Sequence, residues 1–191
     1  MRIVAGSLRG RVLKAPSGTA TRPTSDRVRE AVFSRIESLA PEALGGTQVL
    51  DAFAGSGALG IEALSRGAAG ATFVERDHAA LAVLRSNLTA LGVERAAHVL
   101  PADVGRAAAS GRLPGAPFSL LFVDPPYRID KSEVRALIDA CALQGALTDG
   151  ALVIWEHATG DVIEWPARFE PFGPRRYGST EVDMAIFRGG E

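Results

Sequence analysis

The sequence predicts an α/β protein in which a mostly parallel sheet is covered by helices on both faces. From Thr47 onward, short apolar segments alternate with helical stretches, a pattern typical of parallel strands joined by crossover helices. The apolar segments are TQVLDAF, ATFVE, AAHVL, FSLLFVD and ALVIWE. Two later segments, RFEPF and RRYGSTEVDMAIF, predict strands joined through Gly178, hence an antiparallel hairpin at the sheet edge.

The composition excludes several classes of protein. With 191 residues the chain is long enough for one packed domain and a small appendage. Its single cysteine cannot form an internal disulfide, and its three histidines lack metal-site spacing, so we expect no metal. No apolar run approaches the ~18 residues of a membrane span, and MRIVAGSLRGR lacks a secretory apolar segment. We therefore expect a cytoplasmic protein.

The N-terminal part reads as a small extension followed by a helix. Residues 1–24 predict an arm or β-hairpin, with RIVAG and GRVLKA as strands around a glycine-containing turn. After Pro23, Val28, Val32 and Ile36 recur at helical spacing, which predicts an amphipathic helix ending before Pro41. We accordingly divide the chain into an extension, 1–24, and a main domain, 25–191.

Basic residues are concentrated in this N-terminal part. Residues 1–40 carry eight Arg or Lys against three acids, although the net charge of the chain is -1. A basic cluster can bind RNA through its phosphates, and a solvated charged face is the alternative. The cluster comprises Arg9, Arg11, Lys14, Arg22, Arg27 and Arg29. We predict RNA contacts for Arg9, Arg11, Lys14, Arg22 and Arg27.

A glycine-rich loop follows the first predicted strand of the main domain. We expect helices at 58–66, 77–91 and 132–143, the first two followed by Gly67 and Gly92. Within DAFAGSGALG, the three glycines have the spacing G-x-G-x-x-G, and Glu75 lies twenty residues beyond Gly55. This spacing also occurs in nicotinamide dehydrogenases, so that function remains an alternative.

The acidic residues near the loop favour a different cofactor. Asp51, at the strand tip, would repel a pyrophosphate but suits S-adenosylmethionine, which carries ammonium and sulfonium groups and no phosphate. Glu75 can accept hydrogen bonds from two ribose hydroxyls, and Asp103 one from the adenine amine. A role as helix N-cap is the alternative for Asp103. The candidate cofactor-binding residues are Asp51, Phe53, Gly55, Ser56, Gly57, Glu75, Arg76, Asp103 and Asp124.

A second motif, Asp124-Pro125-Pro126-Tyr127, directly follows the strand FSLLFVD. Two prolines remove two backbone donors, so the local polar groups are chiefly the Asp124 carboxylate and the Pro125 carbonyl, both acceptors. Acceptors hold and orient an exocyclic amine as it attacks a methyl group. Tyr127 supplies a face on which a flipped base can stack. We therefore predict catalytic roles for these four residues.

The chain resembles the bacterial 16S ribosomal RNA guanine-N2 methyltransferase family, within the class I S-adenosylmethionine-dependent methyltransferases. The resembling stretches are RIVAGSLRGRVL, RPTSDRVREAVF, DAFAGSGALGIEALSRGA, VERD, VDPPY and RRYGSTEV. The resemblance implies a Rossmann-like, seven-stranded sheet with a reversed final hairpin and a small RNA-contacting N-terminal extension. It also implies a cofactor pocket at the glycine loop and an amine-binding corner at Asp124–Tyr127.

Methylation of guanine N2 in 16S ribosomal RNA, within the small subunit or its assembly intermediate, is thus the leading hypothesis. A DNA adenine-N6 or protein glutamine-N5 methyltransferase is the alternative enzyme, since both can use a similar Pro-Pro corner. A ribosome-assembly factor that binds RNA without catalysis is the non-enzymatic alternative. A monomer is expected by default.

Overall fold

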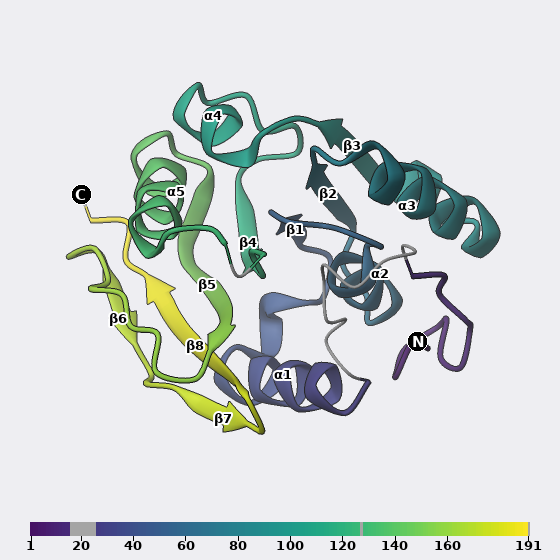
Figure 1. Cartoon of the computed structure of the whole chain (residues 1–191), viewed down its shortest axis with the longest axis horizontal. Coiled ribbons are helices and arrows are strands. Elements are labelled where there is room, and N and C mark those ends of the chain that lie inside the picture. Colours follow the sequence, from purple (N-terminus) through teal and green to yellow (C-terminus); the bar gives the residue numbers. More distant parts are fainter. Residues whose placement is uncertain (16–25, 127, 191) are drawn as a thin grey trace.

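The computed structural model describes residues 1–15, 26–126 and 128–190. In these ranges, eight strands form one sheet in the order β3-β2-β1-β4-β5-β8-β6, and β7 also pairs with β8 (Figure 1). The strands are β1 (Gln48–Asp51), β2 (Gly70–Glu75), β3 (Ala97–Pro101), β4 (Phe118–Val123), β5 (Leu147–Ala158), β6 (Phe169–Pro171), β7 (Arg175–Tyr177) and β8 (Thr180–Phe187). The first five are parallel, and β8 runs antiparallel to β5.

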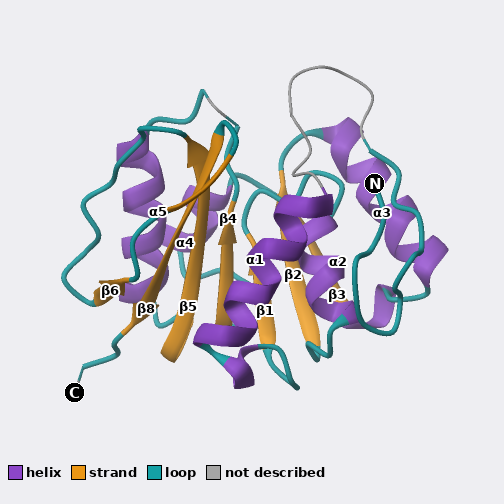
Figure 2. Ribbon diagram, turned by 90° about the horizontal axis from the view of Figure 1, so that it is seen from below, coloured by secondary structure: helices purple, strands orange, loops and turns teal. Residues whose placement is uncertain are grey.

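Helices cover both faces of the sheet, as the sequence predicts (Figure 2). Their bounds are α1 (Asp26–Leu39), α2 (Ala58–Ser65), α3 (His78–Leu91), α4 (Val104–Ala109) and α5 (Lys131–Leu143), with 3₁₀ turns at Pro41–Ala43 and Glu94–Ala96. One apolar core lies between the sheet and α1, α2 and α3, and a second between the sheet and α4 and α5. No helix of the described ranges is long and apolar enough to cross a membrane.

The C-terminal hairpin differs in position from the prediction. It forms between β7 and β8 around Gly178, but β8 lies inside the sheet, between β5 and the two short strands. Val182, Met184 and Ala185 of β8 are fully buried, which explains why an apolar strand occupies this interior position. β6 and β7 share the edge position beside β8, so the described sheet has eight strands where seven are expected.

The helix that Asp103 was expected to cap, as the alternative to its cofactor role, is α4. The segment VGRAAA of α4 has six residues, too few for a clear apolar periodicity, but the Asp103 side chain caps its first turn by accepting a hydrogen bond from the Arg106 amide. Gly92 is the C-cap of α3 in the left-handed conformation, whereas the C-cap of α2 is Arg66, one residue before Gly67.

The N-terminal segment 1–15 packs against the main body. Its expected strands are reduced to one antiparallel bridge between Arg2 and Val12, flanked by a hydrogen bond from the Gly10 amide to the Ile3 carbonyl. Ile3 and Leu13 are 2% exposed and belong to the core beneath α1, α2 and α3. The amides of Val4, Ala5, Ser7 and Leu8 instead donate to α2, and the Lys14 amide donates to α3, so local strand pairing is short.

Arg29 does not belong to the exposed basic cluster, which corrects the sequence reading of that residue. Its side chain is 0% exposed, because it lies on the inward face of α1 with Val32 and Phe33. The guanidinium donates to the Arg2 carbonyl and to Asp26, and lies 3.5 Å from the Glu62 carboxylate. Glu62 in turn accepts from the Val4 and Ala5 amides. Arg29 therefore ties the N-terminal segment to α2.

Candidate functional site

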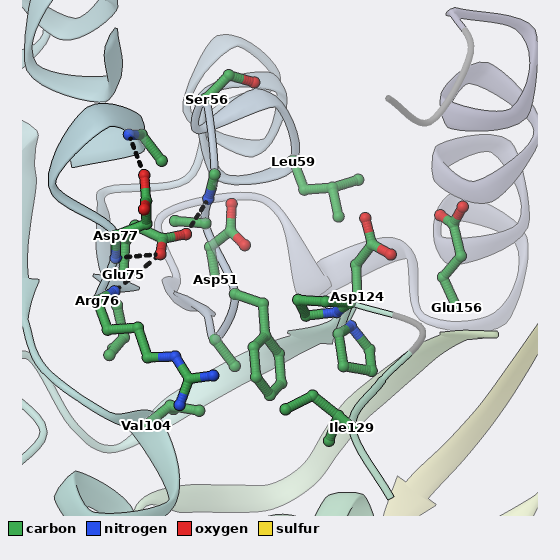
Figure 3. A pocket seen from close by; sticks show the side chains of 18 of the residues that line it. Asp51, Ser56, Leu59, Glu75, Arg76, Asp77, Val104, Asp124, Ile129 and Glu156 are labelled. Atoms are coloured by element: carbon green, nitrogen blue, oxygen red, sulfur yellow. Dashed lines mark hydrogen bonds between the residues drawn. The ribbon is translucent and has the colours of Figure 1, made fainter. Parts of the chain in front are cut away.

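A cavity of about 760 Å³ opens at the carboxyl ends of the parallel strands. Ligands of open α/β sheets bind at this edge. Ten of the predicted residues line it, namely Asp51, Phe53, Gly55, Ser56, Glu75, Arg76, Asp103, Asp124, Pro125 and Pro126 (Figure 3). Tyr127 lies outside the described residues. We refer to the ends of β1, β2 and β3 as the cofactor half, and to the ends of β4 and β5 as the amine half.

Asp51 ends β1 and is 2% exposed. One of its carboxylate oxygens accepts a hydrogen bond of 3.0 Å from the Gly60 amide. Burial, reinforced by the charge of Glu75 and opposed by the Gly60 hydrogen bond, raises the pKa of Asp51 to about 7. A buried carboxylate of this kind strongly favours a nearby cation, which would restore its ionised form.

The glycines of the loop have different roles. Gly55 lines the cavity, where its backbone lies open to a ligand. Gly57 precedes α2 with φ of 84°, and a Cβ there would lie 2.4 Å from a methyl carbon of Leu84. A Cβ on Gly60 would lie 2.3 Å from the Phe73 ring. Gly57, a predicted cofactor residue, is not part of the cavity lining, and together with Gly60 it lets α2 approach its neighbours closely.

Glu75 ends β2 and organises the loops around it. Its carboxylate accepts hydrogen bonds from the amides of Gly55 at 2.9 Å and of Arg76 and Asp77 at 2.8 Å each. These contacts hold the side chain at the cavity wall and leave the remaining lone pair of Oε2 for a further donor, such as a ribose hydroxyl.

Asp103 performs the N-cap role that the sequence left open. One of its oxygens accepts from the Arg106 amide at 3.1 Å, and the other pairs with Arg76 at 3.2 Å. Both side chains also line the cavity. Asp103 and Arg76 thus form the outer wall of the cofactor half.

In the amine half, Asp124, Pro125 and Pro126 follow β4 and face the cavity. Several lining residues were missed by sequence reasoning, among them the polar side chains that β5 and β8 contribute: Glu156, His157 and Thr180. Glu156 follows the apolar segment ALVIW, much as Asp51 follows QVL, and this repeated placement of an acid was the available signal. Thr180 comes from β8, which no local pattern places beside β5.

His157 is held between two acceptors. Its Nε2 lies 3.0 Å from an Asp183 carboxylate oxygen and its Nδ1 lies 3.0 Å from the Ala158 carbonyl, while its ring stacks on Trp155 at 3.9 Å. Burial lowers the pKa of His157, but the hydrogen bonds to Asp183 and Ala158 outweigh it, so the pKa is raised. The contact between His157 and Asp183 holds the end of β5 to β8.

Four of the predicted RNA-contacting residues, Arg9, Arg11, Lys14 and Arg27, are exposed, and Arg22 lies outside the described residues. Lys14 belongs to a link between the N-terminal segment and the glycine loop. Its backbone exchanges hydrogen bonds of 2.9 and 3.0 Å with the Asn87 side chain, which also donates to the Ser56 carbonyl. Met1 and Ala15 line the cavity as well. The N-terminal segment, which carries Arg9, Arg11 and Lys14, therefore borders the site.

The donor set of the cofactor half fits S-adenosylmethionine better than a dinucleotide. A pyrophosphate bound at α2 would meet the buried Asp51, and the Gly60 amide already donates to that carboxylate. Carboxylates at the ends of β1 and β2 instead suit a cation and ribose hydroxyls. This arrangement disfavours the dehydrogenase alternative.

Known proteins resemble the chain over most of its length. Residues 1–186 match the family model described as Conserved hypothetical protein 95. The chain is 42% identical to "Putative rRNA methyltransferase YlbH" of Bacillus subtilis, covering 82% of each. It is 41% identical to "Ribosomal RNA small subunit methyltransferase D" of Escherichia coli, covering 82% of this chain and 74% of that protein.

A solved structure agrees with these relatives. The "Putative methyltransferase yhhF from Escherichia coli" superposes with a TM-score of 0.83 and 37% identity, covering 100% of this chain and 99% of that one. The fold is therefore that of a class I methyltransferase, as the sequence predicts. The chain belongs to the family described as Conserved hypothetical protein 95. Its similarity to proteins named as ribosomal RNA methyltransferases confirms the resemblance seen in the sequence.

Proposed function

We propose that this protein transfers a methyl group from S-adenosylmethionine to the exocyclic N2 of a guanine in 16S ribosomal RNA. The observation that carries the proposal is a single cavity whose two sides are lined by different chemical groups. Asp51 and Glu75 border the glycine loop on one side, and the acceptors Asp124 and Pro125 face the same space on the other. A methyl donor and an amine can therefore meet without leaving the cavity.

S-adenosylmethionine is the cofactor, and when bound it supplies an electrophilic methyl group. Asp51 favours its cationic end through a buried carboxylate. Glu75 holds the ribose hydroxyls, because its carboxylate is already oriented by three backbone amides. Asp103, with Arg76, borders the place of the adenine.

The amine half orients the base. Asp124 and the Pro125 carbonyl accept the two N2 hydrogens, which draws electron density onto the nitrogen and stabilises the positive charge that develops as it is methylated. Asp124 need not be a strong base, because the methylated nitrogen is acidic and its proton can pass to water. Tyr127 stacks on the flipped base.

The N-terminal extension, residues 1–24, contacts the RNA backbone. The N-terminal segment that borders the cavity carries three exposed basic residues, Arg9, Arg11 and Lys14. Arg27 in α1 is exposed as well, and Arg22 belongs to the same cluster in the sequence. Phosphate contacts of this kind position an RNA without reading its sequence. The relative named for small-subunit methylation supports the small ribosomal subunit as the substrate. We propose that the enzyme acts as a cytoplasmic monomer.

The decisive experiment supplies labelled S-adenosylmethionine and purified small ribosomal subunits that lack the modification. Digestion of the RNA to nucleosides should release labelled N2-methylguanosine. Label in adenosine, DNA or protein would replace the proposed substrate with one of the alternatives, and tight cofactor binding without transfer to any of these would favour an RNA-binding assembly factor.

A further inference from the structure

The amine half contains an acid that the proposed chemistry does not yet use. We propose that Glu156 accepts the N1 hydrogen of the target guanine and so selects guanine over adenine and cytosine. The inference rests on the proposed function, since it concerns the base held at Asp124.

The sheet places Glu156 beside Asp124. Val123 of β4 pairs in parallel with Trp155 of β5, and Asp124 and Glu156 are the next residues on the two strands. Neighbouring strands lie about 5 Å apart, and side chains at matching positions of parallel strands share a face. Both residues line the cavity, and in Figure 3 the carboxylates of Asp124 and Glu156 both point away from Ile129.

A count of hydrogen-bond donors assigns the role. The edge of guanine that carries N2 presents three hydrogens, two on the amine and one on N1. Asp124 and the Pro125 carbonyl accept the amine hydrogens, so the N1 hydrogen faces the next acceptor along this wall. Glu156 is the neighbouring carboxylate, and two adjacent carboxylates are stabilised by a ligand edge that donates to both.

The same carboxylate excludes other amines. Adenine presents an amine beside N1, and cytosine presents one beside N3, and both ring nitrogens are acceptors in the neutral base. Either base would direct a ring-nitrogen lone pair at the Glu156 carboxylate, which leaves two facing acceptors without a proton between them. The corner Asp124–Pro126 alone serves any of these amines, so guanine selection requires a residue outside it.

Glu156 is held firmly enough to discriminate. It lies in the middle of a ladder in which Trp155, Glu156 and His157 pair with β8. Its partner across that ladder, Val182, is 0% exposed, and the adjacent His157 is fixed to Asp183. A specificity residue on a rigid strand keeps its geometry better than one on a loop.

The test compares Glu156→Gln with Glu164→Gln, a matched change at a side chain that is 85% exposed. Wild-type enzyme first maps the target guanine in small subunits. Subunits reconstituted with 2-aminopurine at that position then present the same amine beside an unprotonated N1. Glutamine can donate to that nitrogen, whereas glutamate repels it.

We expect Glu156→Gln to lower kcat/KM for guanine by roughly 10- to 100-fold, as for loss of a charged hydrogen bond. The preference for guanine over 2-aminopurine should shrink or invert, while S-adenosylmethionine affinity stays as in wild type. Glu156→Asp should retain the guanine preference at reduced rate, and Glu164→Gln should match wild type.

An unchanged preference in Glu156→Gln, with guanine still methylated by the wild type, would overturn the assignment of Glu156 alone. A loss of rate that is equal on both substrates would also overturn it, because a purely structural role predicts no change of preference. Failure of the wild type to methylate any guanine would instead overturn the proposed function.

Discussion

The two halves of the cavity use acidic side chains in different ways. In the cofactor half, Asp51 accepts a hydrogen bond from a backbone amide of α2, and Glu75 accepts three from the loops that surround it. In the amine half, Asp124 is followed by two prolines, which have no amide hydrogen to donate. The carboxylates of the first half therefore shape their loops as well as facing a ligand, whereas the backbone of the second half adds acceptors.

Because of this difference, we expect mutations in the two halves to change different measurable properties. Changes in the cofactor half should alter protein stability and cofactor affinity together, because the same oxygens serve both. Changes in the amine half should alter turnover with little effect on either.

The largest effect is expected for Asp124→Ala. Loss of the acceptor that holds the amine should lower kcat by about 10²- to 10⁴-fold. S-adenosylmethionine affinity, measured by calorimetry, should remain near wild type. The control is Asp139→Ala on the exposed face of α5, which should keep full activity. Wild-type turnover in Asp124→Ala would remove the catalytic role of the amine half.

Next in size is Glu62→Ala, behind the glycine loop. Glu62 and Arg29 are both 0% exposed, and removing the carboxylate leaves a buried guanidinium beside two amides that lose their acceptor. The free energy of unfolding should fall by about 3–5 kcal/mol in denaturant titrations.

Glu37→Ala is a matched control for Glu62→Ala. Both glutamates form an ion pair with Arg66, but the Glu37 side chain is 51% exposed. Its loss should cost about 1 kcal/mol or less. Equal losses in the two variants would show that the N-terminal segment does not depend on the buried pair.

A pH effect is expected at Asp51. Its pKa of about 7 in the cofactor-free protein lies above its usual value of 3.8, so the folded protein binds the extra proton. This contribution to stability is present below pH 4 and is lost as the pH rises toward 7.

A cationic cofactor binds the ionised carboxylate, so its affinity should fall by up to about tenfold per pH unit below pH 7. Calorimetry between pH 5.5 and 8 measures this change. Asp51→Asn should bind more weakly at high pH and lose the pH dependence. An identical pH profile in Asp51→Asn would assign the titration to another group.

The smallest effect is expected for the basic segment. Replacing Arg9 and Arg11 with Gln should weaken RNA binding several-fold and reduce the salt dependence by about one unit of slope per lost phosphate contact. Cofactor binding should not change. Arg112→Gln, an exposed change after α4, serves as the control for charge alone. Parallel loss of RNA and cofactor binding would indicate that these arginines support the cavity wall instead.

Most of the fold could be predicted because most of its helices and strands have recognisable patterns in the local sequence. The apolar segments of β1 to β5 and the helical spacing of α1, α3 and α5 appear in short windows of sequence. VGRAAA of α4 is too short for such a pattern. Arg29 was assigned to the basic cluster, since a charged side chain on an inward helix face is recognisable only once Glu62 and the Arg2 carbonyl are beside it.

The candidate site divides in the same way. Asp51, Glu75 and Asp124 were found because each ends an apolar strand near a recognisable motif. Glu156 ends a strand too, but no motif follows it, and only the pairing of β4 with β5 brings it to Asp124. Thr180 reaches the cavity through β8, whose interior position is set by long-range pairing.

The class of fold, the glycine loop, the amine corner and the family resemblance could all be inferred from the amino-acid sequence alone. These depend on residue types at short spacings, which act through local backbone geometry and hydrogen-bonding capacity. Only the folded chain shows the burial of Arg29, the packing of the N-terminal segment near the glycine loop, and the placement of Glu156 beside Asp124 at the cavity. Such contacts join residues tens of positions apart, and only the burial of apolar surface on both faces of the sheet brings them together.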